Sequence, residues 1–296
     1  MTHTRSPARA SARRLIAVLG LSLSVLAIEV AGGVAAHSLA LLADAAHVFT
    51  DVAGIGLALL AISVGSRPAS PERTYGYLRL EILAAVVNAV LLFGVAAFIL
   101  YEAWRRLSAP PHVASGLMLG VAAAALLING ASMWLLRHAQ AKSLNMRAAY
   151  LELMSDLAGS AAVIVAALAI LATGWTRADA VASLAIALLV LPRTWALLRD
   201  ATDVLLEATP KGVRMDEVRA HILDAPGVDG VHDLHAWTIT SGVNVVSAHV
   251  VLKAGADGAA ALDFLCDCLS AHFDIEHSTF QLEFPDRRRQ EGAAHG

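Results

Sequence analysis

Two short stretches place metal-binding side chains in pairs inside long apolar runs. In "HVFTDVAG", His47 stands four residues before Asp51, and in "ELMSDLAG", Glu152 stands four residues before Asp156. Residues at this spacing lie on one face of a helix, one turn apart. Each ionisable group near a bilayer centre costs about 2.5–3.5 kcal/mol, so a chain that keeps such groups provides a partner. Imidazole and carboxylate donors suit a divalent transition metal, and the two pairs predict a four-ligand site.

Small and acidic residues accompany these pairs. Gly54 and Gly159 each come seven residues after the first ligand of a pair, and small residues let membrane helices approach closely. Asp44 precedes His47 by one turn, which suits an outer partner of the site. Glu29 either hydrogen-bonds between helices or carries protons. Hydrogen bonding between helices is also an alternative for the two pairs, but their matched spacing favours ligands and suggests two related halves.

The composition indicates a membrane protein. The chain has 296 residues, of which 57% are hydrophobic and 16% charged, and its mean hydropathy is +0.62. Soluble chains are about 45–50% apolar and about 25% charged. The net charge of −3 gives no indication of a nucleic-acid partner.

Apolar runs long enough to span a bilayer occur repeatedly before residue 200. A spanning helix needs about 20 apolar residues, and Pro and Gly interrupt the pattern between runs. The first run is too long for a cleavable signal peptide. We therefore expect a six-helix transmembrane domain at 15–200 after an N-terminal arm at 1–14. The runs are 15–36, 38–64, 82–103, 114–136, 149–172 and 178–198.

Basic residues in the short connections predict the orientation, because they concentrate on the cytoplasmic side. Three lie on one side: Arg105, Arg106 and Arg177. Twelve lie on the other: Arg5, Arg9, Arg13, Arg14, Arg67, Arg73, Arg79, Arg137, Lys142, Arg147, Arg193 and Arg199. We therefore expect a multi-pass protein of the cell inner membrane with both termini in the cytoplasm.

The composition changes after Asp200, and residues 201–285 predict a separate cytoplasmic α+β domain. Its elements in order are a helix, two strands, a helix and a strand, which suits helices packed on one face of a sheet. The last stretch, "HSTFQLEF", alternates strictly between apolar and polar residues, as a half-buried strand does. The polar tail at 286–296 is predicted to be disordered. The five elements are 214–225, 230–239, 243–253, 259–273 and 277–284.

The two cysteines, Cys266 and Cys268, fall in "FLCDCL". Two cysteines are too few for a disulfide framework. If the segment is helical, residues two apart point in different directions, so a metal shared between them is not expected. We interpret both as ordinary thiols.

Several of these segments together resemble the cation diffusion facilitator family. The likeness runs from about Arg14 to Glu283 and is greatest to the bacterial cobalt–zinc–cadmium resistance branch and the vesicular zinc transporters. The matching segments are "SLALLADAAHVFTD", "TYGYLRLEILAAVVNA", "NMRAAYLELMSD", "GVHDLHAWTITSG", "SAHVVL" and "HSTFQLE".

The resemblance implies a homodimer with six spans and a ferredoxin-like cytoplasmic domain in each subunit. It implies a proton-coupled antiporter, not an enzyme, that exports divalent cations from the cytoplasm. Zn is the expected main substrate, and Co, Cd, Fe and Mn are further candidates. No prosthetic group is expected. The partners are a second copy, the bilayer, metal ions and protons. The implied transport site is His47, Asp51, Glu152 and Asp156, with Asp44 and Glu29 as outer or proton-path groups.

The family resemblance also implies a second metal site in the cytoplasmic domain. It comprises His232, His249 and Glu283, with His277 close by. His235 is a less favoured substitute for His232.

Position 152 departs from the family pattern, because zinc-transporting relatives normally have His there and this chain has Glu. Oxygen donors favour harder ions, whereas imidazole suits zinc, copper and nickel. The departure predicts a selectivity broadened toward Co, Fe or Mn and a steeper pH dependence. The alternative is a tolerated replacement without a change in specificity.

Two other classes of function fit parts of the pattern. A membrane-anchored metal sensor would use the spans only as an anchor, and an anchor needs no ligands inside its spans. An intramembrane metallohydrolase would need an open coordination position and usually an HExxH-like motif, which the chain lacks. Metal uptake into proteoliposomes without cleavage of a substrate distinguishes the three.

Overall fold

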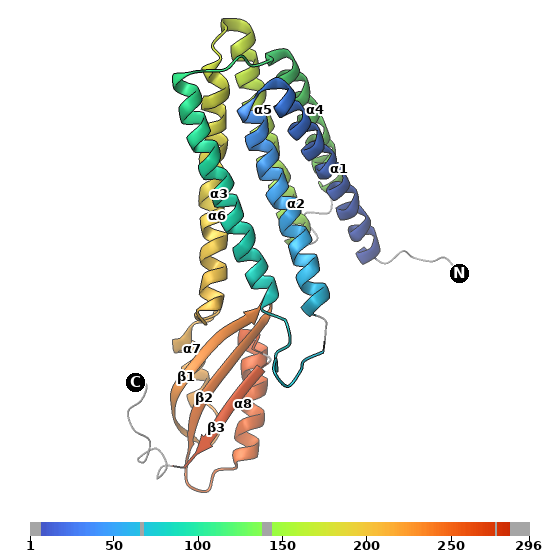
Figure 1. Cartoon of the computed structure of the whole chain (residues 1–296). Coiled ribbons are helices and arrows are strands. Elements are labelled where there is room, and N and C mark those ends of the chain that lie inside the picture. The colour runs from blue at the N-terminus through green and yellow to red at the C-terminus, as the bar shows by residue number, and fades with distance from the viewer. Residues whose placement is uncertain (1–6, 66–67, 138–143, 276, 285–296) are drawn as a thin grey trace, which may run out of the picture. The chain divides into compact units, whose positions relative to one another are not determined.

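The structure of this chain is a computed structural model, and the chain divides into two compact units (Figure 1). Unit 1 comprises Met1–Leu59 and Val87–Leu198, and unit 2 comprises Leu60–Val86 and Arg199–Gly296. The structure describes residues 7–65, 68–137, 144–275 and 277–284, excluding the side chains of 7–15, 55, 57–62, 65 and 144–149. The predicted tail at 286–296 lies outside the described residues.

Long helices coincide with the expected apolar runs. Among the residues that the structure describes, five helices are long and apolar enough to cross a membrane: α1 from Ile16 onward, α3, α4, α5 and α6. Helix α2 has 27 residues, and several of its side chains lie outside the described set. The chain therefore has a helical membrane domain. The helices are α1 Pro7–Ala36, α2 Leu39–Gly65, α3 Leu80–Ser108, α4 Ser115–Leu136, α5 Leu144–Thr173 and α6 Arg177–Leu205.

Glycines permit close helix packing at several places in unit 1. A Cβ added to Gly32 of α1 would overlap the Val121 side chain of α4. A Cβ on Gly159 would overlap the Asp44 carboxylate, which joins α5 to α2. A Cβ on Gly54 would lie 3.1 Å from the Asn88 amide nitrogen of α3. The expected role of Gly159 and Gly54 in close approach thus has a specific polar neighbour in each case.

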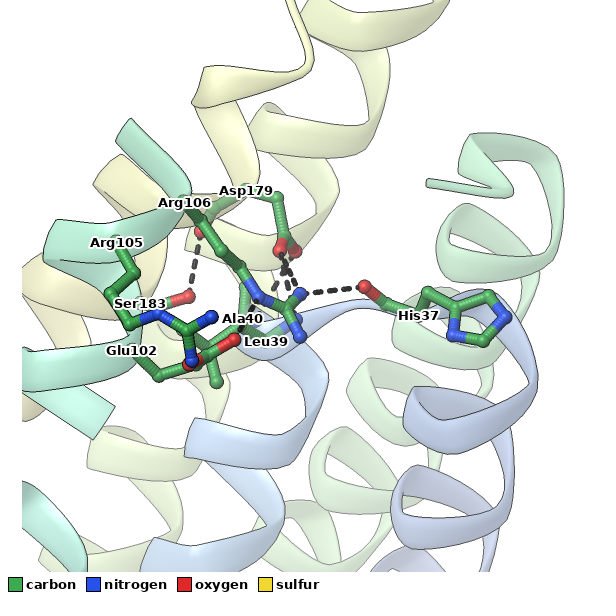
Figure 2. A network of polar contacts seen from close by, with 8 residues as sticks. All are labelled: His37, Leu39, Ala40, Glu102, Arg105, Arg106, Asp179 and Ser183. Carbon is green, nitrogen blue, oxygen red and sulfur yellow. Dashed lines mark hydrogen bonds and ion pairs between the residues drawn. The ribbon is translucent and has the colours of Figure 1, made fainter. Parts of the chain in front are cut away.

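A buried polar network fixes the turn between α1 and α2 in unit 1 (Figure 2). The Asp179 carboxylate at the start of α6 accepts hydrogen bonds from Leu39 N at 2.8 Å, Ala40 N at 3.2 Å and Ser38 Oγ at 2.6 Å. The N–H groups of Leu39 and Ala40 are among the backbone donors that a helix N-terminus leaves without intrahelical partners. Arg106 of α3 lies 3.6 Å from Asp179 and donates to the His37 carbonyl. One acid therefore connects α2, α3 and α6.

The C-terminal part of unit 2 has the predicted order of elements. These are α7 Met215–Leu223, β1 Val228–Thr240, β2 Val243–Leu252, α8 Gly258–Phe273 and β3 His277–Glu283. The strands form one sheet in the order β1-β2-β3, with β1 antiparallel and β3 parallel to the central β2 (Figure 1). The domain is thus a small mixed sheet with helices.

The alternation of side chains along β2 separates the two faces of the sheet. Val246, Ala248, Val250 and Leu252 join one core with residues of α7 and α8, so both helices cover this face. His249 lies between these positions and points to the opposite face. On β3, Phe280 and Leu282 contact the same core as predicted, whereas the predicted apolar Phe284 is 61% exposed.

The start of α3 belongs to unit 2 and contacts the sheet there. The Glu81 carboxylate accepts hydrogen bonds from Thr240 Oγ1 and, at 2.9 Å, from Ser241 Oγ in the turn between β1 and β2. Arg79 Nη2 lies 2.8 Å from Glu207 Oε1. The turn contains Gly242, whose φ of 76° glycine adopts without strain.

Candidate metal centres

Three of the four predicted transport ligands lie together in unit 1. His47 Nε2 is 3.7 Å from Asp51 Oδ2 on its own helix and 3.6 Å from Asp156 Oδ1 on α5. One ligand atom from each residue lies within 4.8 Å of the other two. Ligands at about 2.0–2.2 Å from zinc are about 3–3.6 Å apart, so a small contraction would allow all three to bind one cation.

Two of these side chains are deeply buried and Asp51 is partly buried, yet all three have unpaired polar atoms. His47 and Asp156 are each 5% exposed. Among the described residues, no hydrogen bond reaches either ring nitrogen of His47, Oδ2 of Asp51 or Oδ1 of Asp156. A buried polar group without a partner costs about 1–3 kcal/mol, and more when charged. The cluster therefore suits a cation or protons as its missing partner.

The fourth predicted ligand, Glu152, has a different partner. Its Oε1 lies 2.8 Å from Arg193 Nη2 of α6, and the two side chains are 29% and 54% exposed. Glu152 is outside the three-residue cluster, although its charge and that of Arg193 act on His47 and Asp51. Arg193, which the sequence interpretation placed after the last span, lies inside α6 next to Pro192.

Asp44 and Glu29 extend the polar region away from these ligands. Glu29 of α1 is 0% exposed, and it lies beside Asp44, which is 1% exposed. Ser160 Oγ of α5 donates to Asp44 Oδ2 at 3.2 Å. A cavity of about 70 Å³ contacts both Asp44 and His47. This volume has room for about two water molecules, each of which takes up about 30 Å³ in the liquid.

A second cluster lies on the sheet face opposite α7 and α8 in unit 2. His232 of β1 and His249 of β2 are direct cross-strand partners, and their ring centroids are 5.0 Å apart. Glu283 of β3 lies 3.2 Å from His232 Nε2 and 2.9 Å from His249 Nδ1. One ligand atom from each of these residues lies within 4.8 Å of the other two. The side chains that the sequence predicted here are thus adjacent.

Glu283 is an anion well suited to this position. Burial alone would raise its pKa, but hydrogen bonds from Gln281 and His232 and the charges of the two histidines lower the pKa below its usual range. Gln281 Nε2 donates to Glu283 Oε1 at 2.6 Å and so fixes the carboxylate. Hydrogen bonds of this kind orient the ligands of metal sites.

A β-bulge brings another acid to the second cluster. His232 pairs with His249, whereas His235 pairs with Ser247, so β1 has an extra residue between these positions. Asp233 in the bulge has a φ of 50°, which is uncommon for a residue other than glycine. Its Oδ2 lies 3.8 Å from His249 Nε2. Bulges often redirect a side chain beside a functional site, and this one directs a carboxylate toward His249.

The other two histidines considered for this site lie elsewhere. His235 Nε2 is 3.0 Å from Asp233 Oδ1 on the exposed side of the bulge. His277 begins β3, six residues before Glu283, which separates the two by about 20 Å along a strand. His277 is therefore not a member of the His232–His249–Glu283 cluster within the subunit.

Comparisons with known proteins identify the family. Residues 15–206 match the family described as the cation efflux transmembrane domain, and residues 210–284 match the cation efflux protein cytoplasmic domain. The chain belongs to the cation efflux family. The resemblance to cation diffusion facilitators is thus confirmed over nearly the whole length.

Named cation efflux proteins are similar over most of their length. The metal cation efflux system protein CzcD of Cupriavidus metallidurans is 45% identical over 99% of this chain and 93% of its own. A cadmium, cobalt and zinc/H(+)-K(+) antiporter of Bacillus velezensis is 37% identical over 86% of this chain and 82% of its own. A solved metal-bound C-terminal domain of the CzcD transporter is 40% identical over 24% of this chain and 99% of its own, with a TM-score of 0.23.

Two residues of this cation efflux protein were missed as parts of its candidate sites. The sequence analysis counts Arg193 among the basic residues of the loops. Its position directly after Pro192 in an apolar run was the available signal that it lies within a helix, where it pairs with Glu152. Asp233 follows His232 directly, and an acid next to a candidate ligand was the available signal. Neither role follows from local spacing, because each depends on a contact with another element.

Proposed function

We propose that this chain is a multi-pass antiporter that exports divalent transition-metal cations from the cytoplasm in exchange for protons. The observation that carries the proposal is the cluster of His47, Asp51 and Asp156, in which polar atoms have no hydrogen-bond partner among the described residues. A membrane-anchored sensor has no need of such a group between its spanning helices. The printed names of two relatives, a metal cation efflux protein and a cadmium, cobalt and zinc/H(+)-K(+) antiporter, support the same function.

The ligand chemistry accounts for coupling to protons. Metal binding requires a neutral imidazole and ionised carboxylates, so a cation that enters from the cytoplasm displaces the protons that occupy the empty site. When the helices rearrange to expose the site to the opposite side, incoming protons compete for His47, Asp51 and Asp156 and release the metal. Asp44 and Glu29, with the cavity beside Asp44, form a route by which protons reach the ligands.

Arg193 changes what Glu152 contributes to the site. With His47 neutral, the three carboxylates of Asp51, Glu152 and Asp156 give a formal charge of −3, and the Arg193 guanidinium at 2.8 Å from Glu152 reduces it to −2. Two imidazoles and two carboxylates would also give −2. Zinc therefore meets the same net charge as in a site with His at position 152, and we propose Zn as the main substrate, with Co and Cd next. Because Glu152 pairs with Arg193, we do not expect the steeper pH dependence of transport that an unpaired Glu152 would cause.

The cytoplasmic domain would hold a resident cation and stabilise a homodimer of six-span subunits. Two imidazoles and a fixed carboxylate on His232, His249 and Glu283 form a donor set suited to zinc, and Asp233 lies close enough to assist. A cation there would neutralise the buried Glu283 and pin β3 to β1 and β2. The sheet with its covering helices is consistent with a ferredoxin-like fold, and the basic residues of the short loops favour cytoplasmic termini.

Transport in proteoliposomes tests the function directly. Purified full-length protein is reconstituted, a pH gradient is imposed, and Zn, Co, Cd, Mn, Fe and Ni are offered in turn. Internal metal and pH indicators should report metal flux coupled to opposite proton flux, with Zn fastest. Metal binding by the reconstituted protein without metal-dependent proton flux under any gradient would instead indicate a sensor.

The cytoplasmic site has its own test. Zinc affinity of a full-length protein with Asp51→Ala and Cys268→Ser, measured by competition with a chelating dye, isolates binding at the His232–His249–Glu283 cluster. Adding His249→Ala should weaken the remaining affinity at least tenfold, whereas His277→Ala should leave it unchanged. Equal effects of the two substitutions would contradict the assignment.

A further inference from the structure

We propose that Cys268, His221 and His272 form a third metal site, a thiolate–imidazole site for a borderline or soft dication such as Zn²⁺ or Cd²⁺. It lies between α7 and α8, on the sheet face opposite the His232–His249–Glu283 cluster. One ligand atom from each of the three residues lies within 4.8 Å of the other two. The site is independent of the transport function.

The distances between the three side chains suit a single cation. Cys268 Sγ is 3.3 Å from His221 Nδ1 and 3.7 Å from His272 Nδ1. Bonds of about 2.3 Å to sulfur and about 2.0–2.1 Å to nitrogen place these donors about 3.6 Å apart at a tetrahedral angle. The observed separations lie on either side of that value. His272 Nδ1 also lies 2.9 Å from the Cys268 carbonyl oxygen, so binding a cation through this atom requires the ring to leave that contact.

The helices hold these side chains in place. Cys268 and His272 are four residues apart on α8, beside the core positions Leu265 and Leu269, and therefore share one face. His221 comes from α7, next to the buried Ile222. The His221 ring also packs edge-on against Phe273, with the centroids 5.1 Å apart. Packing of this kind limits the rotamers of a ligand and lowers the cost of binding.

The surroundings favour a cation over a reactive thiol. The carboxylate of Asp224, the residue that follows α7, places negative charge near the Cys268 thiol. Negative charge favours a bound cation and is unlike the electropositive surroundings of reactive cysteines. Cys266 contacts Ser278 instead, at 3.4 Å, so the two thiols face different neighbours. Sulfur with imidazole selects softer ions than the oxygen-rich cluster around His47.

A thiol-specific measurement separates this site from the other two, because the chain contains only two cysteines. Full-length protein is stripped of metal and titrated with Cd²⁺ while the thiolate-to-cadmium charge-transfer absorption is recorded. Wild type and the matched control Cys266→Ser should show the band at one equivalent of thiolate, and Cys268→Ser should lose it. A band that persists in Cys268→Ser, or is absent in wild type, would overturn the site.

Alkylation kinetics test the histidines. In the Cys266→Ser protein, Zn²⁺ should slow maleimide modification of the remaining thiol at least tenfold. Adding His221→Gln or His272→Gln should raise the Zn²⁺ concentration needed for half-protection at least tenfold, while His235→Gln leaves it unchanged. Elution position on gel filtration confirms that each variant is folded. Equal protection in all variants, or none in Cys266→Ser, would show that the three residues merely hydrogen-bond.

Discussion

Asp179 and Asp156 are both acids buried in the helical unit, but their surroundings are opposite. Asp179 is 1% exposed and both of its carboxylate oxygens accept hydrogen bonds, with Arg106 nearby (Figure 2). Asp156 is 5% exposed, and its Oδ1 accepts none among the described residues, although His47 lies 3.6 Å away. Burial alone thus does not distinguish a structural acid from a functional one; the presence of donors does.

The difference can be explained by position along the helices. Asp179 stands in the first turn of α6 and faces the first backbone N–H groups of α2, which need acceptors. Asp156 lies in the middle of α5, where every backbone donor nearby is already used within a helix. A carboxylate at a helix end finds partners in the fold itself. One in the middle of a helix needs a partner from outside, and the predictions below test this contrast.

The largest effect is expected for Asp156→Asn. The amide keeps the shape of the carboxylate but removes the charge that holds a dication, so metal flux in proteoliposomes should fall to the level of empty liposomes. Asp51→Asn should reduce the metal flux to the same level. The yield of folded protein, measured by gel filtration, should not fall. Flux within twofold of wild type in either variant would mean that the cluster does not bind the transported metal.

Asp179→Ala should show the reverse pattern. It removes the acceptors of Ser38 and two backbone N–H groups and one of the two carboxylates beside the guanidinium of Arg106, which keeps Glu102 at 3.1 Å. Breaking a buried charge pair costs about 3–5 kcal/mol, and because Arg106 remains partly exposed we expect about 3 kcal/mol. Denaturant unfolding in detergent measures this loss.

The comparison between the two acids requires that Asp156→Asn does not destabilise the protein to the same extent. Zinc affinity of the folded fraction of Asp179→Ala should equal that of wild type. A large loss of affinity there, or equal destabilisation by both substitutions, would remove the distinction.

Gly159→Ala tests the packing beside the unpartnered cluster. The added Cβ would overlap the Asp44 carboxylate and force it or α5 to move, which overpacking data put at about 1–3 kcal/mol. Gly120→Ala in α4 is the matched control, because nothing lies within 4 Å of its added Cβ. The control should be neutral or up to about 1 kcal/mol more stable, since alanine favours helix. Thermal unfolding of the two variants in one detergent makes the comparison, and equal shifts would contradict it.

The sequence predicted the features that depend on local spacing. The spacing of four residues placed His47 and Asp51 on one helix face, and they lie 3.7 Å apart. Of the second predicted pair, Asp156 lies 3.6 Å from His47, whereas Glu152 pairs with Arg193. Cys268 and His272 also stand four residues apart, and this spacing was the local signal for their shared helix face. The helices α3 and α6 extend beyond their apolar runs, since polar residues continue a helix that hydropathy no longer detects.

Features that depend on contacts between distant elements were not predictable in the same way. The bulge at Asp233 arises from the register of β1 against β2, which no single strand encodes. The ion pair of Glu152 with Arg193 requires the rotation of α6 against α5. The family resemblance implied His277 close to the cytoplasmic site, but six residues of extended chain separate it from Glu283. Spacing thus gives the candidates, and only the assembled fold selects among them.

The smallest effect, and the finest test of the contrast, concerns Glu152 and Arg193. Unlike Asp156, Glu152 has a cationic partner, but unlike Asp179 it is partly exposed, so it should be intermediate between the structural and the functional acid.

Glu152→His alone leaves Arg193 close to the dication and should lower Zn affinity several-fold. Adding Arg193→Leu removes that charge and should restore the affinity to near the wild-type value. Arg193→Leu alone exposes the full −3 charge and should tighten binding of harder ions such as Mn²⁺ a few-fold. Zinc and manganese affinities of the four proteins form a double-mutant cycle, whose coupling for an exposed pair should be about 0.2–1 kcal/mol. A coupling of zero would show that Arg193 does not set the charge of the site, and Glu152 would then act on the metal without a partner.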